Sequence, residues 1–86
     1  MMKPILYFSH WCSDTEPFAT ELERFGIDYE PCDITKCSAN FKPFLRLRDR
    51  HAAFDHAKEN GYIGIPALVW KDDVYLDPDE LESSFK

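Results

Sequence analysis

Apolar residues in the first third of the chain follow the order strand, helix, strand. The run from Ile5 to Phe8 has the length of a strand and predicts a buried one. The next apolar positions are three or four residues apart, which predicts an amphipathic helix, and they are Phe18, Leu22 and Phe25. Ile27 and Tyr29 then alternate with polar residues, so we predict a second strand over residues 27–33.

The boundaries of this first helix are marked by three residues. Pro17 is easily accommodated only in the first turn of a helix, which favours Asp14 as the N-cap. Gly26 follows the last apolar position and is typical of a helix end. The segment before the helix, Ser9 to Asp14, is therefore expected to be a polar loop that leads out of the first strand.

A longer helical region is predicted from about Asn40 to Asn60, closed by Gly61. Its apolar positions are interrupted by the charged residues 48–50, so the region could be two helices or one bent helix. The basic residues near this interruption are Lys42, Arg46, Arg48, Arg50 and His51. They indicate a solvated helix face, with an anion-binding rim as the alternative. His51 and His56 do not share a helix face well and are expected on the surface.

The last part of the chain predicts a hairpin followed by a helix. Residues 65–70 give the strongest strand pattern, residues 71–73 a turn, and residues 74–76 a short return strand. Asp77 and Pro78 form an N-cap followed by a proline at the first helical position. The final helix is expected to bury Leu81 and Phe85.

This order of elements predicts an α/β fold in one domain that spans residues 1–86. A strand–helix–strand beginning requires a parallel pair, and the late hairpin adds an antiparallel strand. We therefore predict a mixed four-stranded sheet with helices on both faces, the compact thioredoxin-like arrangement. No repeat or linker divides the chain.

Net charge narrows the range of partners. The formal charge of −6 repels nucleic acids and anionic membranes, so neither is expected to bind. No signal sequence or membrane span is visible, and the cytoplasm is the expected location. In that compartment the three cysteines are expected to be reduced, and we expect a monomer.

Cys12 is the candidate reactive group, because it lies between a predicted buried strand and an amphipathic helix. Thiolates are favoured at helix N-termini, where unpaired amide groups favour negative charge. A protonated His10 would favour the thiolate further, whereas Asp14 opposes it. Pro66, at the head of a strand, is either a plain strand-start proline or a cis proline that exposes the backbone of Ile65 beside the thiol.

Three segments resemble the glutaredoxins in order and spacing. Residues 7–15 (YFSHWCSDT) are similar to the first strand and active loop of that family, and residues 63–69 (IGIPALV) to its cis-proline strand. Residues 76–81 (LDPDEL) fall where the family has a ligand-binding turn and its final helix. The resemblance covers nearly the whole chain.

The resemblance implies a role for each matching residue. Cys12 would be the attacking thiolate, and Thr15, if not a plain helix residue, would donate a hydrogen bond to it. Ile65 would offer backbone hydrogen bonds to the substrate, with Pro66 in cis. Trp11 would form one wall of the groove, and Asp79 matches the acidic residue that contacts the γ-glutamyl end of glutathione.

The chain also departs from the family pattern at several positions. Thr15 replaces the second cysteine of dithiol members, and the Cys-Gly-Phe-Ser motif of members that share an iron–sulfur cluster is absent. Ser9 replaces a lysine three residues before the cysteine, and Leu76-Asp77 replaces a Gly-Gly pair. A monothiol enzyme can still exchange disulfides in two steps with a small thiol.

The expected function is therefore a glutaredoxin-like thiol–disulfide oxidoreductase. It would reduce mixed disulfides, carried by a protein or a small thiol, with glutathione or another low-molecular-weight thiol as cosubstrate. The alternatives are a non-enzymatic binding or redox-regulatory module of the same fold and, less favoured, an iron–sulfur carrier.

The other two cysteines, Cys32 and Cys37, have a simpler expected role. Both are expected to be small, partly buried apolar residues, with a distant resolving thiol as the alternative. Together with His10 and Cys12 they offer zinc-binding atoms, but their spacing matches no compact zinc motif, so no metal is expected.

Overall fold

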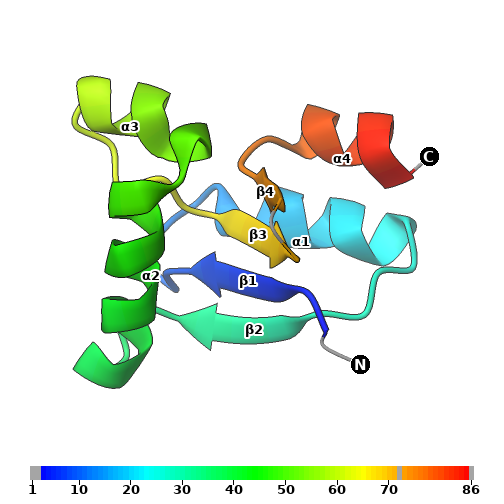
Figure 1. Cartoon of the computed structure of the whole chain (residues 1–86). Helices are drawn as coiled ribbons and strands as arrows, with labels where there is room; N and C mark the ends of the chain where they lie inside the picture. The colour runs from blue at the N-terminus through cyan, green and yellow to red at the C-terminus, as the bar shows by residue number, and fades with distance from the viewer. Residues whose placement is uncertain (1–2, 72, 86) are drawn as a thin grey trace.

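The computed structural model describes residues 3–71 and 73–85, with residues 82–85 described by their backbone only. Figure 1 shows the elements along the chain. In chain order they are β1 (Ile5–Phe8), α1 (Thr15–Arg24), β2 (Glu30–Asp33), α2 (Ser38–Arg50), a 3-10 turn η1 (Ala52–Phe54), α3 (Asp55–Glu59), β3 (Ala67–Trp70), β4 (Asp73–Tyr75) and α4 (Pro78–Phe85).

Within the described ranges the strands form one mixed sheet with the order β2-β1-β3-β4 (Figure 1). β1 is parallel to β2, with Phe8 opposite Asp33, and antiparallel to β3, with Tyr7 opposite Ala67. β3 and β4 form the predicted antiparallel hairpin. The carboxyl end of β1 therefore lies beside the end of β2 and the beginning of β3. Residues 9–14, the predicted active loop, leave the sheet at this end.

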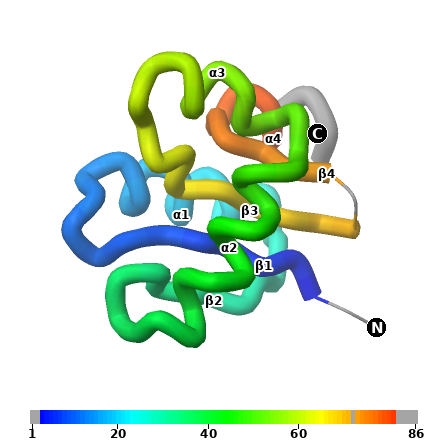
Figure 2. Tube along the Cα trace, turned by 60° about the vertical axis from the view of Figure 1, so that its left-hand side comes forward, coloured from blue at the N-terminus to red at the C-terminus, as the bar shows by residue number. Residues whose placement is uncertain are grey.

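Helices cover both faces of the sheet, as the pattern predicts. Figure 2 shows α2 in front of the strands and α1 and α4 behind them. The core cluster on the α1–α4 face consists of Leu6, Phe18, Leu22, Leu68 and Leu81. The cluster on the α2 face consists of Ile34, Phe44, Phe54, Ala67 and Val74. Neighbouring residues of a strand point to opposite faces, so Leu68 and Ala67 belong to different clusters.

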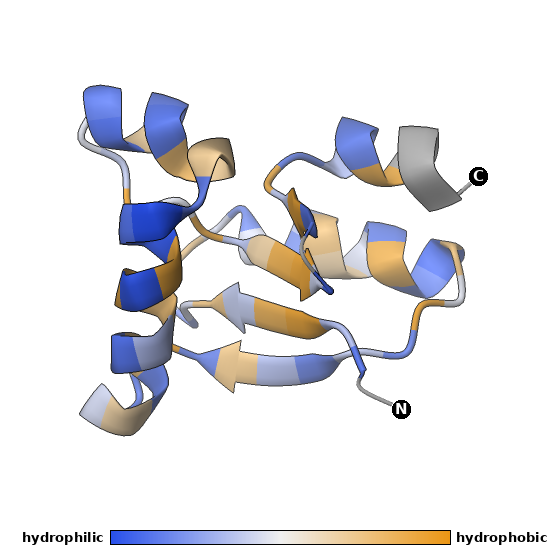
Figure 3. Ribbon diagram, viewed as in Figure 1, coloured by the Kyte–Doolittle hydropathy of each residue, from blue (hydrophilic) through white to orange (hydrophobic). Residues whose placement is uncertain are grey.

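The helices are amphipathic and bury one face each. In Figure 3, orange hydrophobic positions alternate with blue hydrophilic ones along α1 and α2. Phe18 and Leu22 of α1 and Phe44 of α2 are fully buried, and full burial of such a side chain stabilises the fold by about 1.5–3 kcal/mol. Leu81 of α4 is buried as predicted, whereas the side chain of Phe85 lies outside the described residues.

Three strands differ from their predicted bounds. β2 begins at Glu30 instead of residue 27, because Ile27 and Tyr29 pack against the α1–α4 core cluster from the preceding loop. β3 begins at Ala67, since Pro66 has no N–H for the ladder and follows a cis Ile65–Pro66 peptide bond. β4 covers residues 73–75, and the predicted turn at 71–73 includes Asp72, which lies outside the described residues.

The helical regions also differ in detail from the prediction. Asp14 occupies the N-cap position of α1, but its backbone is helical and its side chain caps no amide. The segment predicted from about residue 40 to 60 begins earlier, at Ser38, and is two helices joined by η1. The break lies at His51, whose backbone is extended and whose Nδ1 accepts a hydrogen bond from the amide of Ala53.

Candidate functional site

Two consecutive turns carry the chain from β1 into α1 and place Cys12 between them. The amide of Cys12 donates to the carbonyl of Ser9 over 3.0 Å, and the amide of Thr15 donates to the carbonyl of Cys12 over 3.2 Å. Cys12 is half-buried and its thiol is free. The predicted loop thus ends in a turn that holds Cys12 three residues before Thr15, the first helical residue.

The sulfur of Cys12 lies against the segment that precedes β3. Its Sγ is 4.0 Å from the carbonyl oxygen of Ile65, 53 positions further along the chain. The Ile65–Pro66 peptide is cis, as the resemblance implies. The β1–β3 pairing causes this approach, because it sets the residues after β1 beside those before β3. The structure therefore brings Cys12, Ile65 and Pro66 together.

An open groove of about 830 Å³ surrounds the sulfur. The active loop, the end of α3, the segment before β3 and Leu76 contribute to its wall. Three large side chains of this lining are unusually exposed: Trp11 at 82%, Tyr62 at 60% and Ile63 at 52%. Exposed apolar residues grouped around one concave site are typical of a binding surface. Trp11 forms part of the wall, as predicted.

A loop opposite the thiol, residues 61–64, is held in place from α2 and from the core. The Nε of Arg48 donates to the carbonyl of Ile63 over 2.8 Å, and its Nη2 donates to the carbonyl of Tyr62. Gly64 has a φ of 95°, and a Cβ there would lie 2.7 Å from Cδ1 of buried Phe54. The sequence pattern predicted that Arg48 belongs to a solvated helix face. Its guanidinium group instead binds the backbone of the loop at 61–64 and so supports the groove.

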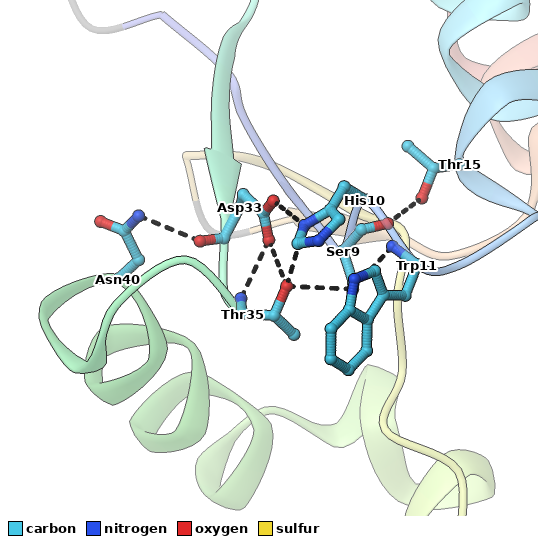
Figure 4. A network of polar contacts seen from close by, with 7 residues as sticks. All are labelled: Ser9, His10, Trp11, Thr15, Asp33, Thr35 and Asn40. Atoms are coloured by element: carbon cyan, nitrogen blue, oxygen red, sulfur yellow. Dashed lines mark hydrogen bonds and ion pairs between the residues drawn. The ribbon is translucent and has the colours of Figure 1, made fainter.

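A chain of hydrogen bonds fastens the active loop to the end of β2 (Figure 4). A carboxylate only accepts, so the Thr35 hydroxyl donates to Oδ1 of Asp33 over 2.7 Å. The Thr35 oxygen then accepts from the hydroxyl of Ser9 at 3.1 Å, and the Ser9 oxygen accepts from the amide of Trp11 at 3.1 Å. Ser9 is only 4% exposed, so these bonds satisfy a buried polar group.

Asp33 is the ionised end of this chain. Its pKa is lowered to about 2, first by the Thr35 hydroxyl and then, against a smaller effect of desolvation, by His10 and the Thr35 amide. His10 Nδ1 lies 2.6 Å from Asp33 Oδ2 and donates to it. His10 therefore pairs with Asp33 beside the loop that carries Cys12.

Asp33 and Thr35 are site residues that the sequence reasoning missed. They contact residues 23 and 26 positions away, which no local pattern shows. A usable signal did exist, because polar residues follow both β1 and β2 and the carboxyl ends of parallel strands meet at one edge.

Thr15 and Asp79, both expected at the site, do not belong to the lining of the groove described above. The Thr15 hydroxyl donates to the carbonyl of Ser9 over 3.3 Å, so it fixes the loop and does not donate to Cys12. Asp79 is exposed in the first turn of α4, where its amide donates to Oδ1 of Asp77 over 2.9 Å. The lining described above does not include Asp79.

Cys32 and Cys37 are free thiols in or beside β2. Cys32 is half-buried, and burial, followed by the neighbouring Cys37 and the carboxylates of Glu30 and Asp33, raises the pKa of its thiol. Cys37 is exposed, so the prediction of partial burial is wrong for it. His56 is exposed, as the sequence pattern predicted, and it also lines the groove.

Residues 3–71 and 73–85 contain neither a metal-binding cluster nor a membrane-spanning helix. No three His, Cys, Asp or Glu side chains in these ranges are grouped closely enough to hold a metal ion. No helix in the same ranges has the length and apolar character needed to cross a bilayer.

Comparison with known proteins places the chain in a family and a fold. No family model matches it. An uncharacterized protein of Haemophilus influenzae is 49% identical over 86 residues, which cover 99% of this chain and all of that protein. The crystal structure of a glutaredoxin from Archaeoglobus fulgidus has a TM-score of 0.68 and 20% identity, over 96% of this chain and 85% of that one. The chain therefore belongs to the same family as the Haemophilus influenzae protein, and its fold is the thioredoxin-like fold of the glutaredoxins.

Proposed function

We propose that this chain is a glutaredoxin-like thiol–disulfide oxidoreductase whose reactive group is Cys12. One observation carries the proposal: the half-buried sulfur of Cys12 faces the Ile65 carbonyl beside Pro66, inside an open groove. A groove that admits a ligand to a fixed sulfur fits disulfide exchange better than it fits a packing role. Ile65 and Pro66 would position the substrate, and Trp11 would cover it.

The reaction would proceed by two exchanges at Cys12. The Cys12 thiolate attacks one sulfur of a mixed disulfide, the old S–S bond breaks, and the other half leaves as a thiolate. A low-molecular-weight thiolate then attacks the new disulfide at Cys12 and restores the Cys12 thiolate. One half of the substrate disulfide is thus released as a thiol, and its other half ends joined to the small thiol as a disulfide.

A monothiol cycle suits the surroundings of Cys12. Thr15 stands where dithiol members have their second cysteine, and neither Cys32 nor Cys37 belongs to the groove lining. A small external thiol would therefore have to release Cys12. This chemistry requires a reducing compartment such as the cytoplasm, and we propose that the chain acts there as a monomer.

Turnover of a neutral probe tests the proposal. Release of the thiol of a labelled peptide from its mixed disulfide with 2-mercaptoethanol would be followed in the presence of excess 2-mercaptoethanol, which ends as bis(2-hydroxyethyl) disulfide. Cys12→Ser is expected to lower the rate to that of the uncatalysed reaction, because serine cannot form the mixed disulfide. Circular dichroism would confirm that the variant is folded.

Cys37→Ser is the matched control. Cys37 is an exposed thiol outside the groove, so its loss should leave the rate within roughly a factor of two of the unmodified protein. Equal rates for Cys12→Ser and the unmodified protein would overturn the oxidoreductase proposal and favour the non-enzymatic binding module.

A further inference from the structure

The electrostatic character of the groove is unlike that of a site built for an anionic ligand. Among the described residues that line it there is no lysine or arginine, and the acidic residue present is Asp14. The whole chain has a formal charge of −6. An anionic substituent on a substrate would therefore approach a negative molecule and meet a carboxylate beside the thiol.

Three bases among the described residues lie near the groove, and each is already engaged. His10 pairs with Asp33. Arg48 reaches the loop at 61–64 but directs Nε and Nη2 at the carbonyls of Ile63 and Tyr62. His56 Nδ1 lies 3.3 Å from the Asn60 amide nitrogen, which can only donate, so this ring nitrogen accepts a hydrogen bond from it.

The position where glutaredoxins have a lysine offers no room for a cation here. That residue is Ser9, which is 4% exposed and hydrogen-bonded to Thr35 and to the Trp11 amide. The exposed rim contributes aromatic and aliphatic surface instead, from Trp11, Tyr62 and Ile63. Such a rim favours apolar or cationic groups, and an aromatic face also attracts a cation.

We propose that the thiol units exchanged at Cys12 are uncharged or cationic, and that anionic disulfides such as oxidised glutathione are disfavoured. This inference rests on the proposed oxidoreductase function and specifies its substrate class. In the exchange, the Cys12–sulfur bond forms as the substrate S–S bond breaks, and one sulfur leaves as a thiolate. The charge by which substrates would be distinguished lies on the carbon substituents of the sulfur atoms, so the bonds formed and broken are the same for every substrate.

Three disulfides of similar size and different charge test the inference. They are cystamine, which is cationic, bis(2-hydroxyethyl) disulfide, which is neutral, and dithiodiglycolate, which is anionic; oxidised glutathione is the fourth probe. The second-order rate at Cys12 would be measured by mass spectrometry at about pH 8, where an ordinary histidine is neutral. Each rate would be divided by that of deuterium-labelled 2-mercaptoethanol with the same probe, which removes intrinsic differences between the disulfides.

The expected order of normalised rates is cystamine, then the neutral probe, then the two anions. At low ionic strength the cystamine to dithiodiglycolate ratio should be roughly tenfold or more, because charge-lined clefts change association rates by at least that factor. At about 1 M salt the ratio should fall toward one, since the Debye length is then only about 3 Å.

Asp14→Asn is the decisive variant, and Asp28→Asn is its matched control. The Asp14 side chain caps no amide, so the change removes a charge from the groove without removing a helix cap. Asp28 precedes β2, at the end of the sheet opposite Cys12, and is an exposed residue paired with Lys3. Asp14→Asn should lower the cystamine to dithiodiglycolate ratio severalfold, and Asp28→Asn should leave it nearly unchanged.

The outcomes separate this inference from the proposed function. If Cys12 reacts faster than the reference thiol but prefers an anionic probe or shows no charge preference, the inference is wrong and the oxidoreductase proposal stands. A preference that Asp14→Asn and Asp28→Asn alter equally would overturn its assignment to the groove. If no probe reacts faster with Cys12 than with 2-mercaptoethanol, the proposed function fails and the inference fails with it.

Discussion

Asp33 is the residue on which the shape of the active loop depends most directly. Its carboxylate accepts from the Thr35 hydroxyl and from His10, and the Thr35 hydroxyl in turn supports Ser9 and Trp11. The side chain is 14% exposed, so water competes with these bonds only in part. The Asp33 carboxylate, at the end of β2, thus links this strand to the residues that precede Cys12.

The lowered pKa of Asp33 predicts a pH dependence of stability. The pKa is lowered to about 2, so the ionised group stabilises the fold fully above its unfolded value of about 4. That contribution is lost as the pH falls from about 4 through about 2. Urea unfolding of the unmodified protein and of Asp33→Asn should differ most near neutral pH, with the variant less stable.

The difference between the two proteins should shrink as the pH approaches 2, because protonated Asp33 then resembles the asparagine. A stability difference that stays constant between pH 7 and pH 2 would show that the Asp33 charge does not support the loop. Asp28→Asn is the control, because the Asp28 carboxylate is exposed and pairs with Lys3 in the ion pair described above. This variant should show nearly the same dependence of stability on pH as the unmodified protein.

Gly64 predicts a packing effect at a single position. Its φ of 95° disfavours any side chain, and an added Cβ would lie 2.7 Å from Phe54, so this fully buried side chain or its surroundings would have to shift. Gly64→Ala is therefore expected to destabilise the protein by about 2 kcal/mol through overpacking, in addition to the backbone cost. Thermal or urea unfolding measures the effect.

Gly61→Ala separates the two contributions to that effect. Gly61 has a φ of 72°, but nothing lies within 4 Å of its added Cβ, so only the backbone cost of about 1 kcal/mol is expected. If both alanine variants lose the same stability, the contact with Phe54 does not constrain the segment that precedes β3.

At the scale of elements, α2 supports the groove through one side chain. Arg48 donates to two carbonyls of the loop at 61–64. Arg48→Ala should lower the disulfide exchange rate severalfold and speed amide hydrogen exchange in residues 61–65, with a loss of stability of roughly 1 kcal/mol. The effect on the rate arises because a loosened loop no longer holds one wall of the groove.

Arg50→Ala is the control on the same helix. Arg50 lies two residues further along α2, beside a separate pocket next to Val69 and Lys71, and away from the Cys12 groove. Its loss should leave both the exchange rate and the protection of residues 61–65 unchanged. Equal effects of Arg48→Ala and Arg50→Ala would point to helix stability as the cause, and would argue against a specific support of the loop.

The elements themselves could largely be predicted from the sequence. Short apolar runs and helical spacing identify β1, α1, β3 and α4, because these periodicities reflect which face is buried. The start of β2 was placed three residues too early, since Ile27 and Tyr29 are buried by packing against the α1–α4 core cluster and not by strand pairing. Alternation shows burial, but it does not show whether a backbone is paired.

At the scale of the whole molecule, the sheet order brings the site together from distant segments. The approach of Cys12 to Ile65 follows from the β1–β3 pairing, and the contact of His10 with Asp33 follows from the β1–β2 pairing. The first was predicted because the glutaredoxin resemblance implies the pairing of the active loop with the cis proline. The second was missed because Asp33 and Thr35 carry no such motif, and the only sequence signal for them is that polar residues occur at the carboxyl ends of two parallel strands.

The reactivity of Cys12 relative to the other two thiols is the most direct test of the oxidoreductase proposal. Folded protein would receive a limiting amount of bis(2-hydroxyethyl) disulfide, and acid-quenched samples would be mapped by peptide mass spectrometry over time. Accessibility alone favours Cys37, which is the exposed cysteine. We predict instead that the adduct forms first on Cys12, roughly tenfold or more faster than on Cys37. Labelling that is equal at the three cysteines, or fastest at Cys37, would contradict the proposal.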